Sequence, residues 1–258
     1  MKNINNINTT FIGKKIIYLE EIDSTNTYLK NIGNQEKDGT VVIAKNQTNG
    51  RGRLGRSFKS GNDEGIYMSI LLKPNISLEK VSFITLIVGA SITKTFNDLG
   101  INSFIKWPND IILNNKKLGG VLTELSFNEN NTYYIVTGIG INVKTLDFDY
   151  DIKNKATSLY KEGYNIRRSI IIKNILENFE KLYKLYINNN DKEEVLKISK
   201  KSSILINKKI YITKNNSKEL VICIDINNNG DLVVKDFYGN IKNIVSGEVS
   251  IRGENGYI

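Results

Sequence analysis

The segment IKWPNDIILNNKKLGGVLTELSFNENNTYYIVTGIGINV, residues 105–143, holds three runs with the apolar and β-branched content of strands. These runs cover residues 105–113, 117–125 and 133–143. The joints between them, Asn114-Asn115-Lys116 and residues 128–131, are rich in asparagine, which tolerates positive φ and suits hairpins. The segment therefore predicts three β segments joined by tight turns.

The flanking sequence alternates strand-like runs with longer helical patterns. Residues 15–19, 40–44 and 66–72 read as strands. Asp23-Ser24-Thr25-Asn26 supplies helix-capping side chains for a short helix that ends near Gly33. Apolar residues at helical spacing over 79–99 predict a helix that stops at Gly100, where glycine can adopt the left-handed conformation. Two further helices are expected over residues 168–187 and 192–200, so the pattern indicates a mixed α/β or α+β domain.

From Asn207 onward the pattern changes to short alternating strands. They are expected over residues 209–213, 220–226, 231–235, 242–245 and 249–251, with turns at 227–230 and 238–240. A small β-barrel of roughly 50 residues is the simplest interpretation, and a core of that size is only marginally stable alone. The predicted organisation is a flexible polar arm over residues 1–12, a main domain over 13–203 and a small β domain over 204–258.

Composition excludes several kinds of chemistry. Apolar residues make up 40% of the chain and charged residues 24%, and no apolar stretch is long enough to cross a bilayer, so we expect a protein without membrane contact. The first twelve residues lack the apolar core of a secretory signal, and the single cysteine, Cys223, fits a reducing compartment, which favours the cytoplasm. The absence of histidine excludes Ser-His-Asp triads and histidine-ligated zinc, and we assign no metal ligand in the protein.

The net charge of +9 raises the possibility of nucleic-acid binding. However, the 30 lysines and 6 arginines are scattered along the chain, and acidic residues interrupt the predicted barrel. The positive field favours anionic substrates or an acidic partner protein instead.

The stretch Gln47-Thr48-Asn49-Gly50-Arg51-Gly52-Arg53-Leu54-Gly55-Arg56 holds three of the six arginines. Guanidinium groups bind carboxylates and phosphates through paired hydrogen bonds, and interleaved glycines let the backbone approach a ligand. With Lys59 nearby, the cations repel one another, which predicts a mobile loop that orders around an anion. Two other interpretations are a dinucleotide-binding turn, which requires a helix directly after the glycines, and a solvated basic loop without a role.

Three more clusters carry polar groups or paired glycines. Lys106-Trp107-Pro108-Asn109-Asp110 is stiffened by Pro108 and holds the only tryptophan, which alternatively is a packing residue. Lys117-Leu118-Gly119-Gly120, with Glu124, and Gly138-Ile139-Gly140-Ile141-Asn142 place glycines inside strands. Such glycines indicate either a ligand or backbone lying against them, or a bulge or tight packing.

Taken in this order, the motifs resemble those of the biotin protein ligase family, over roughly residues 21–252. The resemblance implies an α+β fold, in which a mixed sheet flanked by helices, similar to class II synthetases, precedes a small SH3-like β-barrel. It places biotin against Ser24, Thr25, Asn26, Gln47, Gly50, Arg51, Gly52, Arg53, Lys117 and Gly120. It places ATP against Arg51, Arg56, Lys106, Trp107, Asn109, Lys117, Asn142, Glu248 and Arg252. Lys106, Asn109 and Asp110 match positions at the junction of the two ligands.

The resemblance also implies the reaction, its cofactor and its partners. The biotin carboxylate attacks the α-phosphate of ATP, with Mg²⁺ assisting, and biotinyl-5'-AMP then biotinylates a lysine of a biotin carboxyl carrier protein. Arg51, Arg53 and Lys117 are the expected electrostatic catalysts, and Asp110 is the expected base for the transfer step. Monomers and homodimers both occur in the family.

Two alternatives are weighed within this resemblance. Some relatives carry a winged-helix domain ahead of the ligase, and only about twelve residues precede Gly13 here, so repressor activity is not expected. A lipoate or octanoate ligase or transferase of the same fold is the nearest other reading. The arginine- and glycine-rich signature of the lipoate ligases ends in a histidine, which this chain lacks.

Overall fold

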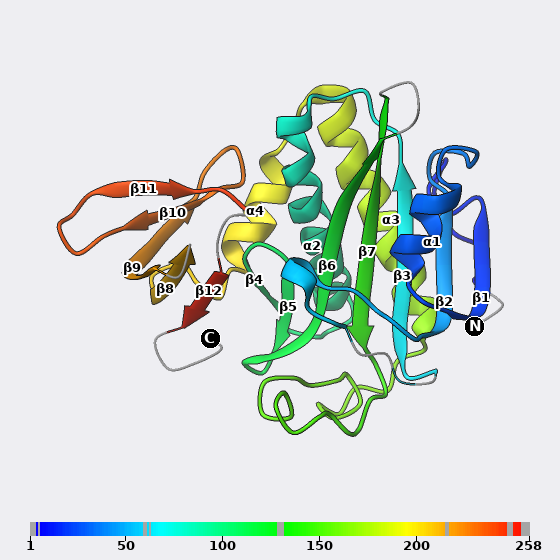
Figure 1. Cartoon of the computed structure of the whole chain (residues 1–258), viewed down its shortest axis with the longest axis horizontal. Coiled ribbons are helices and arrows are strands. Elements are labelled where there is room, and N and C mark those ends of the chain that lie inside the picture. Colours follow the sequence, from blue (N-terminus) through cyan, green and yellow to red (C-terminus); the bar gives the residue numbers. More distant parts are fainter. Residues whose placement is uncertain are drawn as a thin grey trace.

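A seven-stranded mixed sheet forms the centre of the main domain (Figure 1). The computed structural model describes residues 4, 6–58, 61, 63–127, 132–214, 217–246 and 250–253. The strand order is β1-β2-β3-β7-β6-β5-β4, in which β1 and β2 are parallel and the other neighbours are antiparallel. The strands are β1 Ile16–Ile22, β2 Val41–Gln47, β3 Gly65–Leu72, β4 Phe104–Lys106, β5 Asp110–Leu113, β6 Lys116–Phe127 and β7 Tyr133–Asn142.

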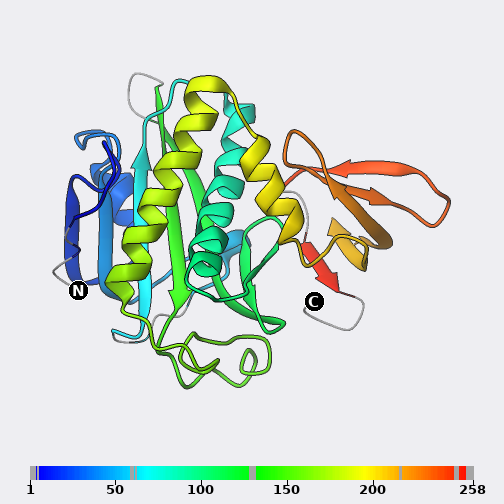
Figure 2. The same ribbon diagram turned by 180° about the vertical axis from the view of Figure 1, so that it is seen from behind.

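Helices cover both faces of this sheet because alternate side chains on its strands are apolar on both sides. Val41 and Ile43 of β2 join the core beneath the long helices α2 (Val81–Asp98) and α3 (Arg168–Asn189), whereas Val42 packs with Leu29 of α1 (Thr25–Ile32). Figure 2 shows α2, α3 and the shorter α4 (Glu193–Lys201) together on one face. The predicted α+β class, with a mixed sheet flanked by helices, is confirmed.

Local sequence signals set most element boundaries. Ser24 caps α1 by accepting a hydrogen bond from the Thr27 N–H, and Gly100 follows α2 with a φ of +77°. Asn114 and Asn115 have φ values of 47° and 60° in the tight turn between β5 and β6, as predicted. The other predicted asparagine-rich joint, residues 128–131, lies outside the described residues.

The run 105–113 differs from the prediction of one strand. It forms two short antiparallel strands, β4 and β5, with a turn at residues 107–109 and a cis peptide bond between Trp107 and Pro108. Proline has no N–H to donate to a sheet ladder, so the run breaks at Pro108. The break turns Asn109 and Asp110 toward the neighbouring strand β6.

Residues 9–12 are packed against the rest of the chain, although residues 1–12 were expected to form a flexible arm. Ile12 is fully buried, and the N–H groups of Thr10, Phe11 and Ile12 donate to the Glu180 carboxylate of α3 at 2.6, 2.9 and 2.9 Å. Burial alone would raise the pKa of Glu180, but these donors and Lys184 lower it to about 2. Because Glu180 lies 168 positions from Ile12, no local pattern indicates this contact.

The carboxyl-terminal part forms a five-stranded antiparallel sheet in the order β11-β10-β9-β8-β12. Its strands are β8 Lys209–Lys214, β9 Ser217–Ile226, β10 Leu232–Lys235, β11 Ile241–Ile244 and β12 Ser250–Gly253. This arrangement is consistent with the predicted SH3-like domain. Trp107 Nε1 donates to the Gly230 carbonyl at 2.9 Å, so the turn between β9 and β10 is bonded to the main domain. None of the helices in the described part of the chain is both long and apolar enough to cross a membrane.

Candidate active site

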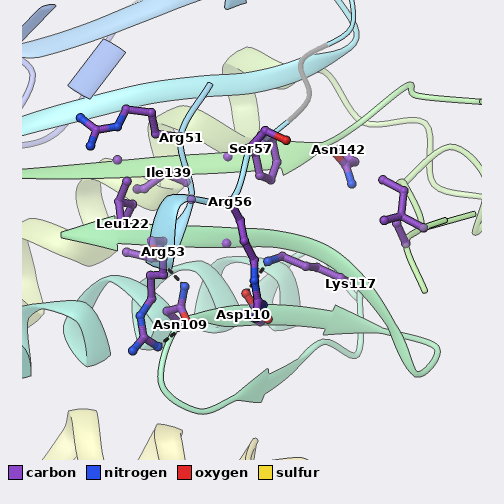
Figure 3. Close-up of a pocket in the computed structure, with 18 of the residues that line it drawn as sticks. Arg51, Arg53, Arg56, Ser57, Asn109, Asp110, Lys117, Leu122, Ile139 and Asn142 are labelled. Carbon is purple, nitrogen blue, oxygen red and sulfur yellow. Dashed lines mark hydrogen bonds and ion pairs between the residues drawn. The ribbon is translucent and has the colours of Figure 1, made fainter. Parts of the chain in front are cut away.

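A cavity of about 760 Å³ lies over β6 and β7, on the side of the sheet crossed by the arginine-containing loop (Figure 3). Five other segments complete its walls: the end of β2, the start of α1, the β4–β5 turn, the segment 145–156 and strand β12. Segments distant in the sequence therefore meet around one space large enough for a small organic ligand.

One end of the cavity is a neutral polar wall, formed by Ser24, Thr25, Asn26 and Gln47. Thr25 donates to Gln47 Oε1 from its backbone N–H at 2.9 Å and from its hydroxyl at 3.1 Å. The buried Ser69 Oγ lies 2.7 Å from Thr25 Oγ1 and 2.6 Å from Asn26 Oδ1. The hydrogen bonds fix these side chains before any ligand arrives, so this wall is preorganised.

The strand glycines make room for side chains of the protein itself. A Cβ on Gly138 would clash with the Asn26 amide, and a Cβ on Gly140 would lie 2.8 Å from the Phe58 ring. A Cβ on Gly120 would lie 3.4 Å from both Asp110 Oδ1 and Lys117 Nζ. Tight packing, the alternative interpretation, therefore holds for Gly138 and Gly140, whereas backbone lies against Gly119 as expected and Gly120 borders the charged groups.

The other end of the cavity, the cationic end, gathers Arg56, Lys106, Lys117 and Arg252 around the carboxylate of Asp110. Lys117 Nζ lies 2.5 Å from Asp110 Oδ1. Lys106 is only 3% exposed, and burial lowers its pKa to about 8, with Asp110 opposing the shift and the neighbouring cations adding to it. Such a cluster is held at an electrostatic cost that an anionic ligand would relieve.

The three arginines of the loop point to different partners (Figure 3). Arg51 Nη1 lies 3.4 Å from Glu124 Oε1, Arg53 donates to Asn109 Oδ1 at 3.1 Å, and the side chain of Arg56 extends toward Asp110 and Lys117. Arg51 therefore lies near the neutral wall. The resemblance places it against ATP as well as biotin, but its side chain points away from the cationic end. Burial lowers the pKa of Arg53 from its ordinary value.

The dinucleotide-binding alternative for this loop is wrong. After a short 3-10 turn, Arg53–Gly55, the next element among the described residues is strand β3 and not an α-helix. A dinucleotide-binding turn needs the positive end of a helix at the phosphates, and this loop supplies none.

Asn109 connects the loop to the sheet. Its Nδ2 donates to the Val121 carbonyl at 2.8 Å while its Oδ1 accepts from Arg53. Asn142, which is 7% exposed, donates to the Thr157 carbonyl at 3.0 Å at the far side of the cavity. Glu248 and Lys59 lie outside the described residues, so the structure does not place them.

Two parts of the lining were not identified from the sequence. Phe58 packs against Gly140, and the segment 145–156 contributes Phe148 and Ile152 to the cavity wall. Lys117 anchors this segment through its backbone, since its N–H donates to the Lys155 carbonyl at 2.7 Å and its carbonyl accepts from Thr157 at 2.9 Å. The segment has no apolar periodicity, and only its mixture of aspartates with Phe148 and Tyr150 distinguishes it in the sequence.

Comparisons with known proteins identify the same family that the motifs resemble. Residues 18–142 match the biotin/lipoate A/B protein ligase family. The bifunctional ligase/repressor BirA of Bacillus spizizenii is 39% identical over 186 residues, which cover 70% of this chain and 57% of the relative. The bifunctional ligase/repressor BirA of Escherichia coli is 27% identical over 242 residues, which cover 93% of this chain and 75% of the relative. The chain thus spans little more than half the length of the Bacillus relative.

A solved structure extends the match to nearly the whole chain. The biotin protein ligase of Aquifex aeolicus, in complex with biotin and ATP, superposes with a TM-score of 0.82 at 30% identity and covers 93% of this chain and 100% of that one. These matches agree with the sequence motifs, with the two sheets and with the residues that line the cavity. This chain belongs to the biotin protein ligase family.

Proposed function

We propose that this protein is an ATP-dependent biotin protein ligase, which makes biotinyl-5'-AMP and transfers biotin to a lysine of a biotin carboxyl carrier protein. One observation carries the proposal: a single cavity has a neutral hydrogen-bonding wall at one end and a cationic cluster at the other. Biotin has the matching polarity, with a neutral ureido ring and an anionic carboxylate tail. We assign the biotin and ATP sites to the domain 13–203, completed by the small domain 204–258.

The neutral wall suits the ring end of biotin. Ser24, Thr25, Asn26 and Gln47 offer hydroxyl and amide groups that pair with the ureido N–H and carbonyl, and Leu122 and Ile139 offer apolar surface beside them. Gly50 and Gly52 let the loop backbone approach the ring, while Arg51 and Arg53 hold the loop through Glu124 and Asn109. The carboxylate tail then points to Gly120 and Lys117 at the cationic end.

The cationic end suits the first chemical step. An oxygen of the biotin carboxylate forms a bond to the α-phosphorus of ATP, and the bond to the departing pyrophosphate breaks. Lys106, Lys117, Arg56 and Arg252 offset the repulsion between the two anions and the charge that develops on the phosphoryl oxygens. Trp107, Asn109, Asn142 and Glu248 complete the proposed nucleotide site, and no protein nucleophile is required.

The second step transfers the acyl group to the carrier. The neutral amine of a carrier lysine attacks the carbonyl carbon of the mixed anhydride, AMP leaves, and the ammonium proton must be removed. Deprotonating an ordinary lysine at neutral pH costs about 4–5 kcal/mol. Asp110 is the proposed base, and its ion pair with Lys117 means that Lys117 has to engage the phosphate before the carboxylate can accept a proton.

Magnesium is proposed to enter with ATP rather than on protein ligands. The described residues include no group of three or more acidic, cysteine or histidine side chains arranged to hold a metal. Asp110, the carboxylate nearest the cationic cluster, is already paired with Lys117. These donors do not fit a resident metal site, and no step is assigned to one.

The test is a direct search for the intermediate. The purified protein is incubated with ATP, Mg²⁺ and biotin, and the bound fraction is analysed by mass spectrometry for biotinyl-5'-AMP. Adding a biotin carboxyl carrier domain should discharge it and label one lysine. Competition by lipoate or octanoate identifies the acid substrate, and an adenylate formed only from lipoate or octanoate would refute the proposal.

A further inference from the structure

Glu124 of β6 has no role in the proposed reaction, yet it contacts both helix α1 and the arginine-containing loop beside the neutral wall. Its side chain is only 17% exposed. Its Oε1 accepts from Lys30 Nζ at 2.9 Å and faces Arg51 Nη1 at 3.4 Å, while its Oε2 accepts from Asn26 Nδ2 at 2.8 Å. Lys30 and Asn26 belong to α1, and Arg51 belongs to the glycine-rich loop, so one carboxylate contacts both segments.

The contact with Glu124 is one of three that fix which atom Asn26 offers to a ligand. The two hydrogens of Asn26 Nδ2 go to Glu124 and to the Leu122 carbonyl, and Ser69 lies at hydrogen-bond distance from Oδ1. An amide oxygen has two lone pairs, so Oδ1 keeps one for a ureido N–H. Without the carboxylate, the Leu122 carbonyl is left as the acceptor for Nδ2, so the amide is held less firmly in this orientation.

The same carboxylate also contacts the loop, through Arg51. Burial tends to raise the pKa of Glu124, but the hydrogen bonds from Asn26 and Lys30 and the charges of Lys30 and Arg51 lower it overall, so Glu124 is ionised at neutral pH. The Arg51 side chain is 46% exposed, and an ion pair so accessible to water stabilises the fold very little. The consequence of this ion pair is geometric, because it keeps the Arg51 side chain beside the neutral wall and away from the cationic end.

We propose that Glu124 is a positioning residue, which ties the loop carrying Arg51 to the α1 wall carrying Asn26 and so sets both the ureido acceptor and the closure of the loop. The inference rests on the proposed function, because the ligand it positions is biotin. It predicts that Arg51 acts on ligand retention through Glu124, and not through direct contact with the phosphates alone.

The first measurement is release of the adenylate. Glu124→Gln keeps the side-chain size but places an amide where Asn26 and Arg51 donate, so biotinyl-5'-AMP should dissociate roughly three- to tenfold faster. Glu124→Asp keeps the charge and should lie closer to the wild type. Lys30→Met removes the other cation on the same carboxylate and is the matched control, expected within about twofold of the wild type. Release at the wild-type rate in Glu124→Gln would overturn the proposal.

A double-mutant cycle separates coupling from general loss of structure. If Arg51 acts through Glu124, Arg51→Gln combined with Glu124→Gln should release the adenylate no faster than the more impaired single variant. Additive effects on the release rate would contradict the coupling. Melting temperatures recorded in parallel identify a purely structural role, which would lower stability without a change in release rate.

Limited trypsin digestion tests the same coupling without any ligand. Trypsin cleaves after Arg51, Arg53 and Arg56, and Glu124→Gln should accelerate cleavage in this loop relative to Lys30→Met. Equal cleavage rates would refute the inference even if the protein makes no adenylate. A wild type that forms no adenylate would refute the proposed function instead, so the two failures are distinguishable.

Discussion

The two ends of the cavity are built in opposite ways. The neutral wall is held in place by hydrogen bonds among Thr25, Gln47, Ser69 and Asn26 that need no ligand. The cationic end places several cations around the Asp110 carboxylate, and burial has already lowered the pKa of Lys106 to about 8. The comparison indicates that the neutral end selects its ligand by shape and hydrogen bonds, whereas the charged end is electrostatically complete only when anions bind.

The largest effect is expected from the cationic end. Lys117→Ala removes the cation that borders both Gly120 and Asp110, and the rate of adenylation should fall by about 10²- to 10³-fold, as for the loss of one charge-stabilising donor. Pyrophosphate release at saturating biotin and ATP measures this step. Lys116→Ala, at the adjacent position outside the cavity lining, is the control. A wild-type rate in Lys117→Ala would remove this residue from the chemistry.

A substitution at the neutral wall should change the KM for biotin more than it changes kcat. Gly138→Ala places a methyl group against the Asn26 amide and should raise the KM for biotin about 10- to 100-fold, because a displacement near 1 Å is enough to spoil a preorganised site. The kcat should change far less. Gly89→Ala is the matched control, since its Cβ meets only Ile105, at 3.9 Å. A selective loss of kcat in Gly138→Ala would contradict the division between the two ends.

The pH dependence should come from the cationic end alone. Lys106 is protonated below a pKa of about 8 and loses its charge as the pH rises through that value. The kcat/KM for ATP should therefore decline above pH 8, approaching tenfold per pH unit if the charge is essential. Lys106→Arg keeps its charge throughout and should remove this decline. A wild-type profile that stays level to pH 9.5 would show that the charge of Lys106 is not used.

The smallest effect is expected where the small domain joins the cationic end. Trp107→Phe removes the N–H that bonds the Gly230 carbonyl, and leaving that acceptor unpaired should lower stability by about 1–2 kcal/mol. Because Trp107 itself lines the cavity and β12 carries Arg252 to the same end, the KM for ATP should rise a few-fold while the KM for biotin stays nearly constant. Denaturant unfolding and separate titrations of the two substrates check this. An equal rise in the KM for ATP and the KM for biotin would contradict the prediction that the small domain acts on the cationic end alone.

Sequence patterns predicted the elements because their signals are local. Ser24 as a cap, Gly100 after α2 and the paired asparagines of the β5–β6 turn each act within a few residues of the chain. The run 105–113 was predicted as one strand because its apolar content masked the break at Pro108. Contacts of high sequence separation gave no such signal, as the Glu180 carboxylate bound to the N–H groups of residues 10–12 illustrates.

The sequence by itself determined the mixed α and β class, the family and the residue types available for chemistry, because these depend on composition, period and ordered motifs. Tertiary structure alone decided where each charge points. Arg51 turns to Glu124, Arg53 to Asn109 and Arg56 toward Lys117, although all three lie within six positions of the chain. The physical reason is that a loop side chain is directed by its partners, and those partners are brought beside it only when β5 and β6 pair in the folded sheet.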